Sequence, residues 1–313
     1  MTEIVLLDGG MGQELVRRSA QPAHPQWSAR VLMEEPEIVQ AVHEDFIRAG
    51  ARVLTLNTYS VTRGRFEKFG MPEQLAPQHR KAIELANAAR DATRTDVIVA
   101  GCLSPLAGSY HPELLPPDAD LLEEYREVVA LQAGAADLFI CETMSKASEA
   151  RMAAMAARET GLPVWVAWTL RDHLDADGAP TLRSGESIAE ALAALDGLEV
   201  EAVLFNCCPP ETISAGLPGL AGSGRAFGGY ANGFGPIPHA FTLGQTVDML
   251  DKRRDFSPAE YTRHCMDWVE AGATIVGGCC EVGPAHIADI SRALQEAGHR
   301  TTGAPTGSRI AAQ

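Results

Sequence analysis

Residues 200–208 read Val-Glu-Ala-Val-Leu-Phe-Asn-Cys-Cys, and this stretch decides the fold class. It is near-continuously hydrophobic, where a strand with one wet face would alternate apolar and polar residues. Such composition is typical of a parallel strand buried on both faces. Seven other runs of the same kind occur along the chain. The eight predicted strands are 3–9, 51–59, 96–104, 136–143, 163–170, 200–208, 225–232 and 273–280.

Amphipathic segments with helical spacing lie between these runs. Residues 36–49 begin with Pro36, place their apolar side chains on one face and stop at Gly50. The other predicted helices are 119–133, 146–159, 186–195, 258–270 and 284–297. Strand then helix, eight times, predicts a single α/β domain with the (β/α)8 TIM-barrel fold, and a doubly wound open sheet is the alternative. We expect the barrel over residues 1–298 and a flexible tail over 299–313.

The amino-acid composition excludes some classes of binding partner. The 313 residues are 46% hydrophobic and carry a net charge of −15, which argues against nucleic acid and membrane surfaces as partners. No apolar stretch of about 18 residues occurs, and the N-terminus has no basic region of the kind that begins a signal peptide. We therefore expect a cytoplasmic protein that acts on small molecules.

The polar residues that matter come where the predicted strands end. In a barrel these ends meet at one mouth, where active sites of this fold lie. Two long loops, 11–35 and 231–257, are expected on the same face. The residues singled out there are Asp8, Gly9, Asn57, Tyr59, Glu142, Cys207, Asn232, Cys279 and Cys280, with Trp27 in the first long loop.

Cysteines are the strongest signal among these residues. The chain has seven, an odd number, with vicinal pairs at 207–208 and 279–280 and no CxxC motif. Three thiolates from two strand ends can bind one Zn²⁺ and leave the fourth position open, as catalytic zinc sites do. Buried core thiols and a redox pair are the alternatives that spacing alone leaves open.

The carboxylates and the tryptophan each allow two interpretations. Asp8 and Glu142 follow buried strands, where they could hold a loop or bind a cationic group such as the ammonium of an amino acid. Trp27 is either a packing anchor or an aromatic wall for a cationic ligand. The phosphate-binding patterns GxGxxG and GxxxxGK[ST] are absent from the sequence.

Taken together, these motifs resemble the homocysteine S-methyltransferase family over residues 3 to 297. The resemblance is carried by Asp8-Gly9-Gly10, Asn57-Thr58-Tyr59, Glu142-Thr143, Asn206-Cys207 and Gly277-Gly278-Cys279-Cys280. It implies Zn²⁺ on Cys207, Cys279 and Cys280. It also implies a homocysteine pocket formed by Asp8, Gly9 and Glu142 and lined by Asn57, Tyr59, Asn232 and Trp27.

The activity that the resemblance implies is methyl transfer to the thiol of L-homocysteine, giving methionine. S-methylmethionine or S-adenosylmethionine is the favoured donor, and betaine or another onium donor and a different thiol or selenol acceptor are alternatives. A non-catalytic subunit that works with a corrinoid protein remains a further alternative. A structural zinc closed by Cys208 is another. We expect a monomer or a small homo-oligomer.

Overall fold

The computed structural model describes residues 2–242 and 245–310 and places a strand at each of the eight predicted runs, with β4 ending one residue beyond the predicted bound. A short ninth strand follows near the C-terminus. The strands are β1 (Glu3–Leu6), β2 (Val53–Thr55), β3 (Ile98–Leu103), β4 (Leu138–Met144), β5 (Val164–Trp168), β6 (Ala202–Asn206), β7 (Ala226–Tyr230), β8 (Ile275–Val276) and β9 (Arg300–Thr302).

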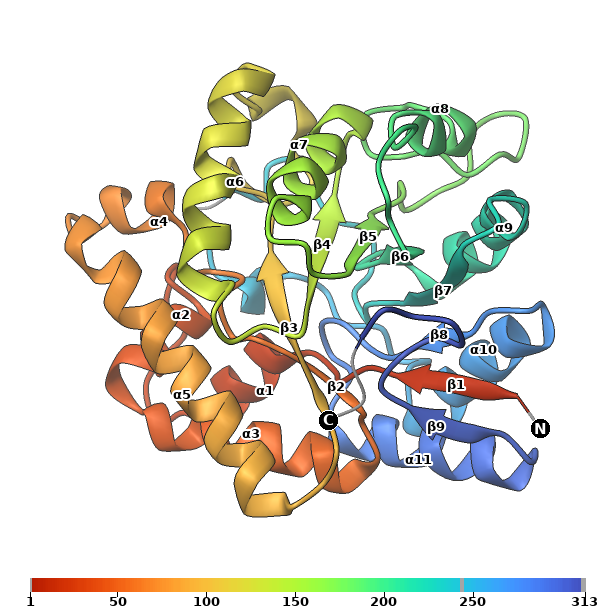
Figure 1. The fold of residues 1–313 in the computed structure, drawn as a ribbon, viewed down its shortest axis with the longest axis horizontal. Helices are drawn as coiled ribbons and strands as arrows, with labels where there is room; N and C mark the ends of the chain where they lie inside the picture. The colour runs from red at the N-terminus through yellow and green to blue at the C-terminus, as the bar shows by residue number, and fades with distance from the viewer. Residues whose placement is uncertain (1, 243–244, 311–313) are drawn as a thin grey trace.

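All these strands belong to one parallel sheet, which curls around a central axis (Figure 1). Neighbours follow chain order from β2 to β8, and β1 then pairs with β8. The chain just after β1 also meets β2, because Leu7 forms a parallel bridge with Val53 and the Asp8 amide donates to the Val53 carbonyl at 3.0 Å. The curl therefore brings the first and last predicted strands side by side and gathers the strand ends at one edge.

Helices lie on the outside of the sheet (Figure 1). The predicted ones are present as α3 (Pro36–Ala49), α6 (Asp118–Gln132), α7 (Ala147–Arg158), α8 (Ile188–Ala193), α10 (Pro258–Glu270) and α11 (Pro284–Glu296). Gly50 ends α3 in the left-handed conformation, with φ 115°, as its position predicted. Gly134, which directly follows the predicted helix 119–133, does not end it in this way, since it is not among the described residues with positive φ.

Five further helices were not predicted: α1 (Met11–Arg18), α2 (Ser28–Glu34), α4 (Arg63–Lys68), α5 (Leu75–Thr93) and α9 (Pro210–Ala221). The expectation of a long loop over 11–35 is therefore wrong. Both α1 and α2 are short, and neither has a side-chain cap to mark its start. The second long loop, 231–257, holds only the 3-10 turn η3 (Val247–Met249) among its described residues.

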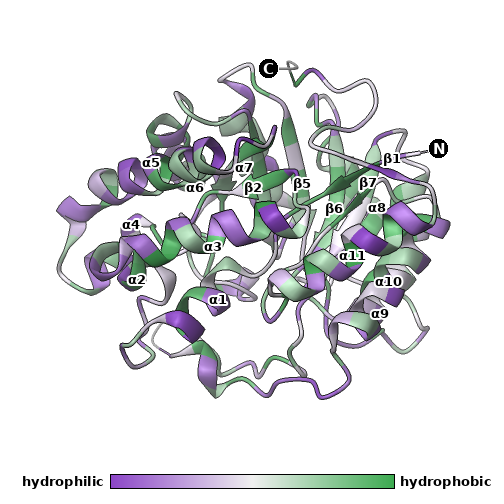
Figure 2. Ribbon diagram, turned by 90° about the horizontal axis from the view of Figure 1, so that it is seen from below, coloured by the Kyte–Doolittle hydropathy of each residue, from purple (hydrophilic) through white to green (hydrophobic). Residues whose placement is uncertain are grey.

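The core has two layers separated by the sheet. Inside the curl, one cluster includes Val5, Ile140, Trp165 and Leu204. Outside, a larger cluster fills the space between strands and helices. Figure 2 shows the consequence, since the central strands such as β5 and β6 are coloured mainly hydrophobic whereas the surrounding helices carry hydrophilic stretches. The near-continuous hydrophobicity of the predicted strands follows from this burial on both faces.

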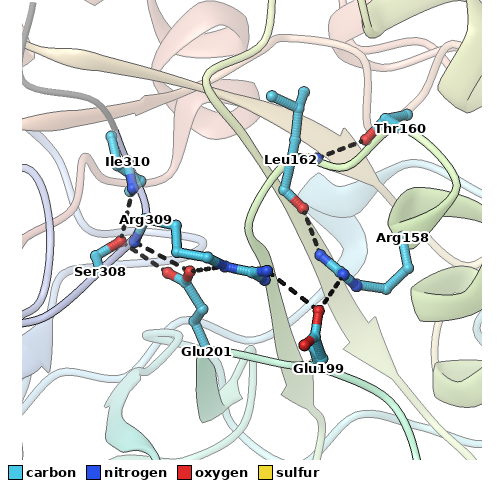
Figure 3. Close-up of polar contacts among 8 residues, drawn as sticks. All are labelled: Arg158, Thr160, Leu162, Glu199, Glu201, Ser308, Arg309 and Ile310. Carbon is cyan, nitrogen blue, oxygen red and sulfur yellow. Dashed lines mark hydrogen bonds and ion pairs between the residues drawn. The ribbon is translucent and has the colours of Figure 1, made fainter.

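The C-terminal segment is attached to the edge of the sheet opposite the strand C-termini. β9 pairs in parallel with β1, with Glu3 opposite Arg300. Figure 3 shows the last described residues, where Arg309 binds Glu201 and Glu199 and the Ser308 hydroxyl donates to Glu201 at 2.7 Å. Ile310 packs against the inner cluster. Within the predicted flexible tail, residues 300–302 thus form a strand, which the polar sequence did not indicate.

Candidate functional site

A cavity of about 1120 Å³, including the part that opens to solvent, lies at the C-terminal edge of the sheet. Residues from the ends of β1, β2, β4, β6 and β8 line it, although they are far apart in the sequence. Most of the residues predicted for the site are among them: Asp8, Gly9, Trp27, Asn57, Tyr59, Glu142, Cys207, Cys279 and Cys280. Asn232 is the exception, since it is buried beside the cavity without lining it.

Three cysteines form a cluster in this cavity. The Sγ atoms of Cys207, Cys279 and Cys280 all lie within 4.8 Å of one another, and those of Cys207 and Cys280 are 4.0 Å apart. Cys208 does not join them, because it packs in the outer core. Successive strand residues point to opposite faces, so only one of each such pair can face inward. The turn after β8 lets both Cys279 and Cys280 reach the cluster.

The electrostatics of the cluster single out Cys207. Hydrogen bonds from the thiols of Cys279 and Cys280 lower the pKa of Cys207 well below its ordinary value, against the opposing effect of burial. The Tyr110 hydroxyl lies 3.0 Å from the Cys207 Sγ, and the Asn232 side-chain amide lies 3.9 Å from it. Donors therefore surround this sulfur, as a thiolate requires.

The donor set suits a zinc ion. Thiolates are soft ligands that select zinc among the common divalent ions. A Zn–S bond of about 2.3 Å in a tetrahedral site places neighbouring sulfurs about 3.8 Å apart. The 4.0 Å between Cys207 and Cys280 matches that spacing without rearrangement of the backbone. Three sulfurs leave a fourth position for a ligand, and all three cysteines line the cavity.

Two buried carboxylates face the same cavity. Asp8 accepts hydrogen bonds from the Thr55 amide at 2.9 Å and the Thr55 hydroxyl at 3.2 Å. Glu142 accepts from the Cys102 thiol at 2.9 Å and the Tyr230 hydroxyl at 3.4 Å. Burial raises the pKa of Asp8 to about 8 and that of Glu142 to about 7. Because no cationic side chain among the residues that the structure describes pairs with them, both carboxyls are suited to a cationic ligand.

The neutral residues complete the wall. The Asn57 side-chain amide nitrogen is buried and has no partner in the described structure, so a donor is free for a ligand. The Tyr59 hydroxyl bonds to the Ser109 hydroxyl at 2.7 Å. The Trp27 ring packs edge-on against Tyr59 at 5.9 Å between centroids, and its Nε1 donates to Gln13 at 3.0 Å. Trp27 is thus both a packing anchor and part of the wall.

Several residues in or beside the cavity wall were missed by sequence reasoning. Tyr110 follows β3, so the rule that strand ends converge could have found it. Cys102 and Tyr230 lie within predicted strand ends, yet nothing in the sequence showed that both would bond to Glu142. Arg65 lies on α4, a helix that was not predicted, and no motif marked it.

The backbone is strained around the site. Non-glycine residues with positive φ include Trp27 (50°), Tyr110 (71°), Thr143 (61°), Cys207 (51°) and Glu281 (69°). Such conformations are costly, most of all for the β-branched Thr143, and they cluster where function requires an unusual side-chain direction. All five residues lie in or next to the cavity wall, which agrees with a functional site here.

Fold and site together define an α/β protein with a buried three-thiol cluster and two carboxylates in one cavity at the strand ends. The family model described as "Homocysteine S-methyltransferase" matches residues 5–294. The chain therefore belongs to this enzyme family, as its motifs predicted.

Individual relatives agree with that membership. The chain is 32% identical to a homocysteine S-methyltransferase of Escherichia coli (strain K12), over 92% of this chain and 94% of the relative. It is 26% identical to a selenocysteine Se-methyltransferase of Brassica oleracea var. italica, over 92% and 88%. Among solved structures, the metallated form of the homocysteine methyltransferase MmuM from Escherichia coli superposes with a TM-score of 0.76 at 29% identity, covering 93% of this chain and 96% of that one.

Proposed function

We propose that this protein is a zinc-dependent methyltransferase that moves a methyl group from an onium donor to the thiol of L-homocysteine, giving methionine. The observation that carries the proposal is the three-sulfur cluster on the cavity wall, with Sγ atoms within 4.8 Å of one another. Cys207, Cys279 and Cys280 would hold the zinc. When bound, zinc supplies a means of keeping the substrate sulfur deprotonated at neutral pH.

The carboxylates and the start of α1 suit the amino-acid part of homocysteine. Asp8 and Glu142 would bind its ammonium group, since both are buried in the cavity wall without a cationic partner. Gly10 precedes α1 and lines the cavity, so the positive end of the helix dipole faces the substrate carboxylate. These contacts fix one end of the substrate and direct its sulfur toward the thiol cluster.

Methyl transfer then requires that the acceptor and the donor are aligned and that water is excluded from the cavity. The thiolate attacks the methyl carbon in line with the donor's carbon–sulfur bond, and the electrons of that bond return to the donor sulfur as a neutral thioether. Charge is lost in this step, so the apolar cavity favours the transition state over the ions. Trp27, Tyr59 and Tyr110 offer aromatic faces to the cationic donor. No general base is required during the transfer.

The favoured donors are S-methylmethionine and S-adenosylmethionine, followed by betaine or another onium compound. A selenol acceptor is a second candidate, favoured by the similarity to a selenocysteine methyltransferase. A structural zinc is disfavoured by the position of Cys208, which packs away from the cluster.

We also propose that the curled sheet is a closed (β/α)8 barrel that forms one homocysteine-binding domain over residues 1–298. The bridge between Leu7 and Val53 and the bond from the Arg52 amide to the Leu6 carbonyl at 2.8 Å support closure between β1 and β2. At the other end of β1, residues Glu3–Val5 pair with β9.

No helix in the described ranges is both long and apolar enough to cross a bilayer.

A donor screen tests the proposed function. Zinc-loaded protein and L-homocysteine are incubated separately with S-methylmethionine, S-adenosylmethionine, betaine and dimethylsulfoniopropionate, and methionine is quantified. We expect methionine from a sulfonium donor, and from none of them once the metal is removed. Tight zinc binding without methionine from any donor would favour the corrinoid-partner alternative and contradict the proposal.

A further inference from the structure

Arg65 is a buried cation in the cavity wall, and none of the described residues supplies its counter-charge. It lies on α4 (Arg63–Lys68), is 9% exposed and lines the cavity. Its Nη1 donates to the Pro25 carbonyl, whereas its Nε is buried without a hydrogen-bond partner. No ion pair joins Arg65 to any carboxylate of residues 2–242 and 245–310. The carbonyl of Pro25 satisfies one donor of the five that a guanidinium carries.

A neighbouring arginine shows the usual arrangement. Arg63, two residues earlier on the same helix, is half-exposed and pairs with Glu127 across to α6. Arg65 turns the other way, into the cavity, where burial lowers the pKa of its guanidinium. Burying a charge without a partner is costly, and the cost falls once an anion binds. An unpaired guanidinium in a ligand cavity therefore indicates an anionic group on the ligand.

The cavity wall carries charges of both signs. Asp8, Glu142 and the thiol cluster contribute acidic groups, and Arg65 is the only lysine or arginine among the described lining residues. The rings of Trp27 and Tyr59, which also line the cavity, pack edge-on at 5.9 Å between centroids. A ligand that fills the cavity thus meets thiols, aromatic rings and a guanidinium.

Resting on the proposed function, we propose that Arg65 binds a carboxylate of the methyl donor and thereby restricts donors to onium compounds that carry one. The proposed function already assigns partners to both charged groups of homocysteine: Asp8 and Glu142 to its ammonium, and the start of α1 to its carboxylate. The donor's cationic centre lies against the aromatic rings, and its carboxylate reaches the free face of the guanidinium. Arginine suits this role because its planar fork pairs with both carboxylate oxygens.

The test compares donors with and without a carboxylate. Arg65→Gln, Arg65→Lys and the control Arg63→Gln are assayed with S-methylmethionine and with its carboxamide, at saturating homocysteine. Loss of one charge-assisted pair predicts a KM for S-methylmethionine about 10- to 100-fold higher in Arg65→Gln. We expect a smaller rise in Arg65→Lys, none in Arg63→Gln, and KM values for the carboxamide that hardly differ among the variants. The KM for homocysteine stays unchanged.

Contrary outcomes are distinct. An unchanged S-methylmethionine KM in Arg65→Gln overturns the proposal, and so does a rise in the homocysteine KM instead, which would assign Arg65 to the acceptor. If Arg65→Gln does not fold, the wild-type protein still tests the proposal. Its KM for the carboxamide must then exceed its KM for S-methylmethionine by a similar factor, and equal KM values overturn the proposal. If the wild type forms no methionine at all, the proposed function fails, and calorimetric titration with S-methylmethionine and its carboxamide tests the subsite on its own: equal affinities would overturn it.

Discussion

The side chain of Asn206, at the end of β6, holds Thr143 of β4 by two hydrogen bonds that reach across the end of the intervening strand β5. Its Oδ1 accepts from the Thr143 amide at 2.8 Å, and its Nδ2 donates to the Thr143 hydroxyl at 2.9 Å. Thr143 follows Glu142, and Asn206 precedes Cys207. Both Thr143 and Cys207 have positive φ. This buried pair therefore keeps the carboxylate and the thiol cluster in a fixed relation and stabilises two strained residues.

Replacing Asn206 by Ala tests that link. The Thr143 amide would be left buried without a partner, which costs about 1–3 kcal/mol of folding free energy. We expect a lower urea midpoint, weaker zinc binding and a higher homocysteine KM together. Thr143→Ser is the matched control, because it keeps the hydroxyl and the amide and removes only the β-branched methyl. If Asn206→Ala left zinc affinity and homocysteine KM unaltered, the pair would have no role in the site.

The thiol cluster predicts that cysteines inside and outside it differ in their importance for zinc binding. Cys279→Ala removes one of the three converging sulfurs, so we expect loss of bound zinc, measured by elemental analysis, and loss of methyl transfer with the fold retained in circular dichroism. Cys208→Ala is the control, since Cys208 packs in the outer core next to Cys207. It should keep one zinc per chain at a modest cost in stability. Retention of zinc and full activity in Cys279→Ala would refute the assignment of the metal site.

Glu142 predicts a pH dependence of ligand affinity. Burial raises its pKa from 4.5 to about 7, so below pH 7 it is protonated and cannot pair with an ammonium group. L-methionine keeps its ammonium charged over this range, so the protonation of Glu142 alone should raise its inhibition constant about tenfold between pH 8 and pH 6. Glu142→Gln should raise that constant at pH 8 and leave a shallower pH profile that comes from Asp8, whose pKa is about 8, with the donor KM little changed. A flat profile in the wild type would argue against this role.

Glu149 predicts a pH dependence of stability away from the site. It is buried on α7, accepts from the Ser145 amide at 2.8 Å and has its pKa raised from 4.5 to about 7 by burial. The folded state then keeps a proton that the unfolded chain releases near pH 4.5. Between pH 4.5 and 7 the unfolded state binds fewer protons, so stability falls as pH rises, by about 3 kcal/mol at most.

Glu149→Gln should remove that slope in urea unfolding measured from pH 5 to 8, because glutamine keeps an acceptor for Ser145. Glu190→Gln is the matched control at the same helix position of α8, where the carboxylate is exposed, bonds to Ser187 and has a lowered pKa. It should change the slope slightly in the opposite sense. Identical slopes in the wild type and Glu149→Gln would show that Glu149 does not titrate as described.

The sequence by itself determined the strands and the order in which their ends could meet. Burial on both faces leaves a continuous apolar run such as 200–208, and this signal is local and strong. The same is true of Cys207, Cys279 and Cys280, because two vicinal pairs at strand ends are readable without coordinates. Helices α1 and α2 were missed because they are short, with eight and seven residues, and no side-chain cap marks where they start.

Only the tertiary structure decided which side chains of the mouth face one another. That Cys102 and Tyr230 bond to Glu142, that Asn206 holds Thr143, and that Arg65 turns from the helical layer into the cavity all depend on the curl of the sheet. The attachment of β9 and Ile310 to the opposite edge is of the same kind. Each contact joins residues distant in sequence, so no local pattern encodes it, and the geometry arises only when the core packs.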